Sequence, residues 1–101
     1  MRFITLIYML KNFKHRGLKE LFKNGRTSRV RADLQKRALR RLDALDAATC
    51  PEDMNIPGFD FHSLQGKPKR YSVHVNGPIC ITFGWENDGA VAIDVNLENY
   101  H

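Results

Sequence analysis

The order of the predicted elements indicates an α+β fold, in which two N-terminal helices pack on one face of a small antiparallel β-sheet. Apolar residues recur at helical spacing in the first half of the sequence, whereas apolar and polar residues alternate in the second half. A basic turn at Gly66–Arg70 separates two of the alternating stretches, as expected between antiparallel strands. The length of 101 residues suits a single domain, 1–101, with one modest core.

The helices are expected between residues 14 and 48. The first covers Lys14–Lys23 and ends at Asn24-Gly25, a common helix stop. Ser28 is the expected cap of the second helix, which runs from about Val30 to Ala48 before Pro51 prevents its continuation. Its buried stripe recurs every three or four residues and contains Val30, Leu34, Ala38, Leu42 and Leu45.

Alternation with a period of two predicts the strands. They fall within residues 58–64, 71–76, 79–83 (with an extension to residue 85) and 91–97. The last strand is expected to place on one face Val91, Ile93, Val95 and Leu97. The face that the helices leave open then holds His62, Ser72, His74 and Thr82. A polar face beside a cationic turn favours binding of a polyanion.

Residues 1–8 are expected to be an N-terminal extension, with Met9 as the true start. This stretch is apolar but too short to span a membrane, and it lacks the small-residue cleavage site of a secretory signal. Cys50 and Cys80 have no CxxC spacing, which favours unpaired thiols in a reducing compartment. The sequence therefore predicts a cytoplasmic protein with no membrane partner.

Basic residues are concentrated in the first half of the chain. The net charge is +5, and residues 1–50 hold 13 Lys and Arg against 4 Asp and Glu. This asymmetry favours an acidic partner, which can be nucleic acid, the ribosome or an acidic protein. The candidate RNA-binding residues are Arg37, Arg40 and Arg41 on the second helix and Lys67, Lys69 and Arg70 in the turn. The same arginines also suit a solvated helix face or a surface that binds a protein partner.

Neither a metal nor a cofactor is predicted. The histidines have no helical pairing, and no Gly-rich phosphate loop or nucleophile elbow occurs. Cleavage of RNA by its own 2′-hydroxyl needs none of these features. It needs a base near the 2′-oxygen, donors or cations at the phosphate, and an acid for the leaving 5′-oxygen. Histidine suits either proton role, and Tyr100 can donate a proton or stack on a base.

Several sequence segments together form a recognisable pattern. They are Phe13–Phe22, Leu42–Ala48, Glu52–Phe59, the pattern His62-x-Leu64-x-Gly66, Tyr71–Gly77, Ile81–Phe83 and the terminal Tyr100-His101. In their order and spacing they resemble HigB-type toxins, the plasmid-maintenance killer branch of the RelE toxin superfamily. The resemblance runs from about Lys11 to the last residue.

This resemblance implies a RelE-like microbial RNase fold and the function of a type II toxin-antitoxin toxin. Such a toxin is a metal-independent endoribonuclease that inhibits translation by cutting mRNA in the ribosomal A site. The resemblance also implies a HigA-like helix-turn-helix antitoxin as partner, with operator DNA bound only through that antitoxin. The catalytic residues that it implies are His62, Tyr100 and His101.

The sequence departs from the family pattern in three places. The family has Lys where this sequence has Gln65, Asn-Trp-Arg at Pro78-Ile79-Cys80, and an acidic residue at Asn99. Two cations directed at the phosphate are therefore replaced, and the basic turn at residues 67–70 is the nearest substitute. The alternative function is that of a catalytically degraded relative, which acts only by binding the antitoxin or the ribosome.

Overall fold

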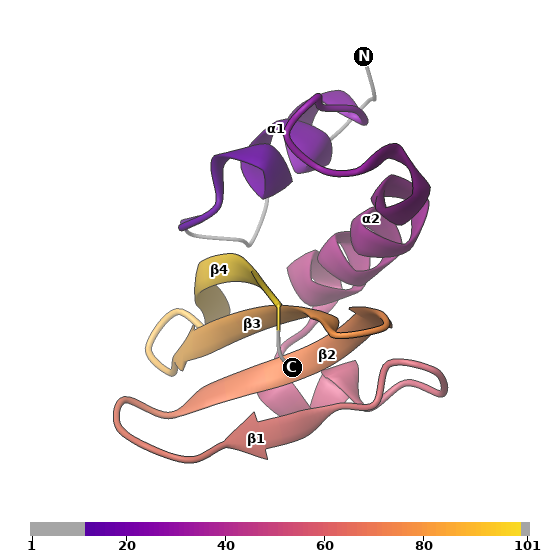
Figure 1. Ribbon diagram of the computed structural model, residues 1–101. Helices are drawn as coiled ribbons and strands as arrows, with labels where there is room; N and C mark the ends of the chain where they lie inside the picture. The colour runs from indigo at the N-terminus through magenta and orange to yellow at the C-terminus, as the bar shows by residue number, and fades with distance from the viewer. Residues whose placement is uncertain (1–11, 100–101) are drawn as a thin grey trace.

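The computed structural model describes residues 12–99 and contains two α-helices, one short 3₁₀ helix and four strands (Figure 1). In chain order they are α1 (Arg16–Asn24), α2 (Ala32–Ala47), η1 (Pro51–Met54), β1 (His62–Leu64), β2 (Arg70–Asn76), β3 (Ile79–Glu86) and β4 (Val91–Asn99). The predicted extension at residues 1–8, Met9 and the terminal Tyr100-His101 lie outside the described residues.

The strands form one antiparallel sheet in the order β1-β2-β3-β4, so each strand pairs with its neighbour in the sequence. In Figure 1, α2 runs behind the sheet, where it packs on β2, while α1 packs on α2 and contacts β4. The opposite side of the sheet carries no helix within residues 12–99 and is called the open face below. The predicted α+β architecture is confirmed.

Local sequence explains both ends of α1. The Leu18 N–H donates to Nδ1 of His15 at 3.2 Å and so caps the first turn, and partial burial lowers the pKa of this imidazole. Only glycine fits at Gly17, since a Cβ there would lie 2.8 Å from Cε1 of His15. Gly25 follows the helix with a φ of 84° and donates its N–H to the Leu21 carbonyl at 2.8 Å. The helix therefore ends where the sequence predicts.

The start of α2 differs from the prediction. Ser28 does not cap the helix, which begins after Arg31, and the Arg31 side chain makes no cap hydrogen bond. Instead, the Gln35 amide donates to the carbonyls of Thr27 at 2.6 Å and Val30 at 2.8 Å. The Gln35 side chain, from the first turn of α2, thus stabilises the loop that precedes the helix.

A single hydrophobic core fills the space between the helices and the sheet. Its largest fully buried side chains are Phe22, Phe83, Leu18, Leu21, Leu42, Leu45, Met54, Ile81, Val73, Val75 and Val95. The predicted stripe that starts at Val30 is confirmed, since none of its members is more than 4% exposed. Burial of each large apolar side chain contributes about 1.5–3 kcal/mol to folding, so this core provides the main stabilisation of the sheet.

β4 does not keep the predicted alternation, because a β-bulge interrupts its pairing with β3. The bulge includes Asp94, whose φ of 51° lies outside the range of a regular strand. Ile93 then lies opposite Gly84 on the open face, whereas Val95 is fully buried on the helix side. The prediction that Ile93 and Val95 share one face is therefore wrong.

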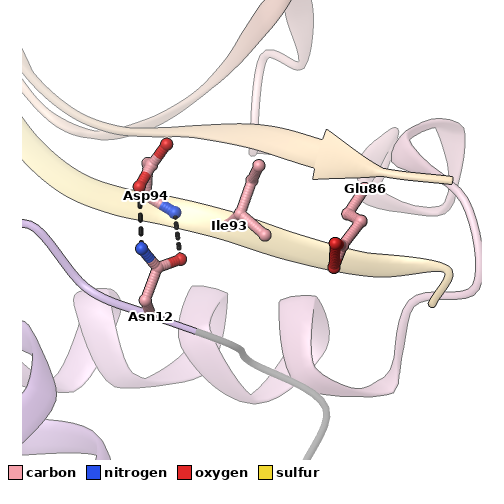
Figure 2. Close-up of a pocket in the computed structure, with 4 residues that line it drawn as sticks. All are labelled: Asn12, Glu86, Ile93 and Asp94. Carbon is pink, nitrogen blue, oxygen red and sulfur yellow. Dashed lines mark hydrogen bonds between the residues drawn. The ribbon is translucent and has the colours of Figure 1, made fainter. Parts of the chain in front are cut away.

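Asn12 holds this bulge from the N-terminal part of the chain. Its Nδ2 donates to Oδ1 of Asp94 at 2.8 Å, and the Asp94 N–H donates to Oδ1 of Asn12 at 2.8 Å (Figure 2). Figure 2 also labels Ile93, next to Asp94 on β4, and Glu86, the last residue of β3. Together with Asn12 and Asp94 they line a pocket of about 420 Å³. A distant side chain thus satisfies backbone and carboxylate groups at an irregular point of the ladder.

Candidate active site

A second pocket, of about 450 Å³, lies on the open face. It is lined by Asp60, His62, Leu64, His74, Gly77, Pro78 and Cys80. These residues come from β1 and the loop before it, the end of β2, the β2–β3 turn and the start of β3. They meet because the three strands pair in sequence order.

Two of the lining side chains are imidazoles, and each is bonded to a backbone carbonyl. Nδ1 of His62 lies 2.9 Å from the Asp60 oxygen, and Nε2 of His74 lies 3.0 Å from the Gly77 oxygen. Because a carbonyl oxygen only accepts, the bonded ring nitrogen carries the hydrogen in each case. In its neutral form, His62 therefore keeps Nε2 as a proton acceptor, and His74 keeps Nδ1.

The short strand β1 sets the position of His62. Pairing with β2 places His62 opposite Ser72, and the preceding Asp60 turns the chain with a φ of 48°. Next to His62, the Phe61 ring stacks on Tyr71 with its centroid 5.8 Å away, which anchors this edge of the sheet. The His62 side chain itself is exposed, so a substrate can reach it.

The backbone of His74 is fixed by two other elements. Its N–H donates to the Phe59 carbonyl at 2.6 Å, and its carbonyl accepts from Nε of Arg41 at 2.8 Å. Phe59 is buried, and Cζ of Arg41 lies 4.3 Å from the centroid of its ring. The half-buried imidazole of His74 is therefore presented to the pocket by a residue whose N–H and carbonyl are both hydrogen-bonded.

The sequence predicts that His74 lies on the open face, but it does not indicate that His74 belongs to the site. The signal that could have found it is the period of two, which puts His62 and His74 on the same face of strands that pair. Their approach to one pocket depends on the register, because a shift of one residue would send one imidazole to the core.

Arg41 does not lie on an accessible surface, contrary to its predicted role in RNA binding. The side chain is 6% exposed, and its guanidinium donates to the carbonyls of His74, Arg37 and Gly58. Burial lowers the pKa of this guanidinium, and the charges of Arg40 and Arg37 lower it further. Arg41 is thus a structural clamp between α2 and β2 and not a cation available to a phosphate.

The other predicted cations of α2 and the β1–β2 loop lie outside the pocket. Arg37 and Arg40 are exposed on α2, and Arg37 also donates to the Val75 carbonyl at 3.3 Å. Lys67 and Lys69 are exposed in the loop between β1 and β2. The structure does not bring any of these four side chains to the pocket that contains His62.

Arg70 crosses the open face instead of pointing to solvent. Its Nη2 donates to Oγ1 of Thr82 at 3.0 Å and to the Asp94 carbonyl at 2.9 Å. The Thr82 hydroxyl in turn donates to Oε2 of Glu98. The Arg70 side chain passes close to Gly84, where a Cβ would lie 3.7 Å from Nη1. Its guanidinium therefore joins β2, β3 and β4, and like Arg41 it serves the fold.

The open face is less accessible than the sequence predicts. Ser72 and Thr82 are fully buried, and Oγ of Ser72 has no hydrogen-bond partner in the described part of the chain. The Arg70 side chain and Glu98 engage Thr82 from above the sheet. The hydroxyls expected to face a ligand are thus removed from the surface, and the imidazoles remain.

The predicted catalytic residues Tyr100 and His101 lie outside the described residues. The last described residue, Asn99, pairs with Ile79 at the beginning of β3. Ile79 directly follows Pro78, which lines the pocket. The described chain therefore ends beside the pocket that contains His62.

Residues 11–101 match the family described as RelE-like toxin of type II toxin-antitoxin system HigB. The chain belongs to this family. A protein named Endoribonuclease HigB from Proteus vulgaris is 40% identical to this HigB-like toxin over 94 residues, which cover 92% of this chain and 100% of the relative. The resemblance found in the sequence is confirmed. The chain is a toxin of a type II toxin-antitoxin system, and an antitoxin is its partner.

Three further features of this HigB-like toxin concern the described residues as a whole. Across residues 12–99, no group of three or more His, Cys, Asp or Glu side chains could hold a metal ion. No helix within that range is long and apolar enough to cross a membrane. Cys50 and Cys80 carry free thiols. Among the described residues that line the pocket, His62 and His74 each keep one ring nitrogen that is not bonded to a carbonyl.

Proposed function

We propose that this HigB-like toxin is a metal-independent endoribonuclease that inhibits translation by cutting mRNA in the A site of the ribosome. The observation that carries the proposal is the exposed imidazole of His62, which is bonded through Nδ1 to Asp60 and keeps Nε2 for proton transfer. The name of the Proteus vulgaris relative, an endoribonuclease, supports this activity.

The reaction joins the 2′-oxygen of one nucleotide to its 3′-phosphorus and expels the 5′-oxygen of the next nucleotide. Nε2 of His62 removes the proton from the 2′-hydroxyl, because this nitrogen holds a lone pair in the neutral ring. His101 returns a proton to the leaving 5′-oxygen, and Tyr100 stacks on a neighbouring base. The products are a 2′,3′-cyclic phosphate and a 5′-hydroxyl end, so no water is consumed in this step.

Surface cations outside the pocket supply contacts to the RNA backbone. Lys67 and Lys69 are exposed in the β1–β2 loop, and Arg37 and Arg40 are exposed on α2. Such contacts add affinity without sequence specificity, and salt weakens them. The toxin acts in the cytoplasm, where it meets ribosomes and a HigA-like helix-turn-helix antitoxin, and it reaches operator DNA only through that antitoxin.

Expression in bacteria without an antitoxin tests the proposal. We expect growth arrest together with new mRNA 5′ ends inside translated codons, mapped by primer extension. The same RNA should stay intact with the purified toxin alone and be cut when translating ribosomes are added. If induction gave neither arrest nor new ends, the chain would be a protein that acts only by binding, as the replacements at Gln65 and Cys80 allow.

Removal of Tyr100-His101 is expected to lower the cleavage rate by at least about 10²-fold, since general acid catalysis typically contributes 10²–10⁴-fold. The melting temperature should change little, because the last residues of a chain are rarely part of a core. Single-turnover cleavage on programmed ribosomes measures the first effect and circular dichroism the second. Asp88→Ala, in the exposed β3–β4 turn, is the control and should retain full activity. A truncated chain that cuts at the parental rate would exclude both residues from catalysis.

A further inference from the structure

We propose that His74 is a second catalytic residue, whose imidazolium donates a hydrogen bond to the phosphate that is cut. The proposal rests on the proposed RNA cleavage and adds the group that stabilises the charge developing on the phosphate. No Lys or Arg occurs among the described residues that line the pocket, and the acidic residue Asp60 does. A phosphate next to His62 therefore needs its donor from the remaining imidazole, that of His74.

The register of the sheet places His74 in the required position. His74 lies directly opposite Cys80 on β3, and His62 lies opposite Ser72, two residues before His74 on β2. Such diagonal neighbours on one face of an antiparallel sheet have their Cβ atoms about 7–8 Å apart. A phosphate group fits between two imidazoles at this spacing, with the 2′-oxygen toward His62 and a non-bridging oxygen toward His74.

The hydrogen bonds of His74 leave one ring nitrogen for the substrate. Nε2 is engaged with the Gly77 carbonyl at 3.0 Å, so Nδ1 is the nitrogen that remains. In the imidazolium form Nδ1 also carries a hydrogen and donates to a phosphate oxygen. The bonds of the His74 backbone to Phe59 and Arg41 hold this donor in place before the substrate arrives. A donor that is fixed in advance costs no reorganisation during the reaction.

The nearest basic side chains cannot take this role as well as His74. Arg70 is engaged by Thr82 and the Asp94 carbonyl. Lys67 and Lys69 belong to the β1–β2 loop, which follows Leu64 at one end of β1. His62 lies at the other end of this strand. Cys80, opposite His74, has a small side chain and lines the same pocket. Cys80, which stands where the family pattern has an arginine, is thus paired with His74 in this chain.

Variants at His74 test the proposal on programmed ribosomes under single-turnover conditions. We expect His74→Ala to lower the maximal cleavage rate by about 10²–10³-fold, as for loss of one preorganised donor. The toxin concentration that gives half-maximal rate should change little, because the interaction develops in the transition state. His74→Arg should recover most of the lost rate, since a guanidinium also donates to phosphate. Asn76→Ala, exposed at the end of the same strand, is the matched control.

The outcomes separate this proposal from the proposed function. If the parent cuts mRNA on ribosomes and His74→Ala cuts equally fast, the role of His74 is rejected and RNA cleavage stands. If the parent itself does not cut, both proposals fail. If His74→Ala loses activity and also melts at a lower temperature, the His74→Arg variant distinguishes a catalytic from a structural role. Arginine can replace the hydrogen-bond donor to the phosphate, but it would not restore the activity if His74 only supported the fold. Failure of that rescue in a folded His74→Arg protein would overturn the proposal.

Discussion

Replacing His62 by glutamine is expected to lower the rate of mRNA cleavage on the ribosome by about 10²–10⁴-fold, the usual contribution of a general base. Glutamine has a similar length and can still donate to the Asp60 carbonyl, but it cannot accept and release a proton. The fold should not change, because His62 is exposed on a three-residue edge strand. Growth arrest after induction should disappear with the cleavage.

Ser63→Ala is the matched control for His62→Gln. Ser63 is the next residue of β1, is equally exposed and does not line the pocket. Both variants should bind the antitoxin as the parent does, since neither substitution alters the core. Growth arrest and mRNA cleavage by His62→Gln at the parental level would show that another group removes the 2′ proton.

The sequence predicts α1, α2, β2 and β3 well because their signals are local, whereas the strand expected within residues 58–64 covers only His62–Leu64. The stripe through Leu34 and Leu42 repeats at helical spacing, and both residues are buried under the sheet. The alternation in β2 likewise separates Val73, in the core, from His74, in the pocket. In a regular helix or strand, the spacing of apolar residues indicates which side chains are buried, because residues at that spacing lie on the same face.

The prediction fails where a contact between distant residues decides the structure. The bulge at Asp94 depends on Asn12, more than eighty residues earlier, and no local pattern reveals that pair. Alternation across Ile93 and Val95 consequently gives the wrong face for Ile93. The Asp94 carbonyl in this bulge also accepts a hydrogen bond from Arg70. Arg70, which the sequence predicts to bind RNA, therefore stabilises the sheet.

Charge alone likewise cannot distinguish Arg40 from Arg41. The two residues are neighbours in α2, so they point in directions about 100° apart around the helix axis. Arg40 faces solvent, while Arg41 faces the buried Phe59 and the end of β2. A prediction that treats a run of arginines as one basic surface therefore merges an accessible cation with a structural one.

Arg41→Met is expected to lower the free energy of unfolding by about 2–4 kcal/mol, the effect of losing charged hydrogen bonds to buried acceptors together with a cation–π contact. Methionine fills a similar volume on the Phe59 ring but donates nothing to the carbonyls of His74 and Gly58. Urea unfolding followed by circular dichroism measures the loss. Arg41→Lys should recover only part of it, because one ammonium cannot replace a planar fork of donors.

Arg40→Met is the matched control, since it removes the same charge from the exposed neighbour and should change the stability by less than about 0.5 kcal/mol. Equal destabilisation by the two variants would mean that helix charge, and not the clamp, is responsible. If the clamp also positions His74, then Arg41→Met should reduce cleavage under conditions where the protein is still fully folded. Loss of stability without that loss of rate would separate the structural role of Arg41 from any effect on the pocket.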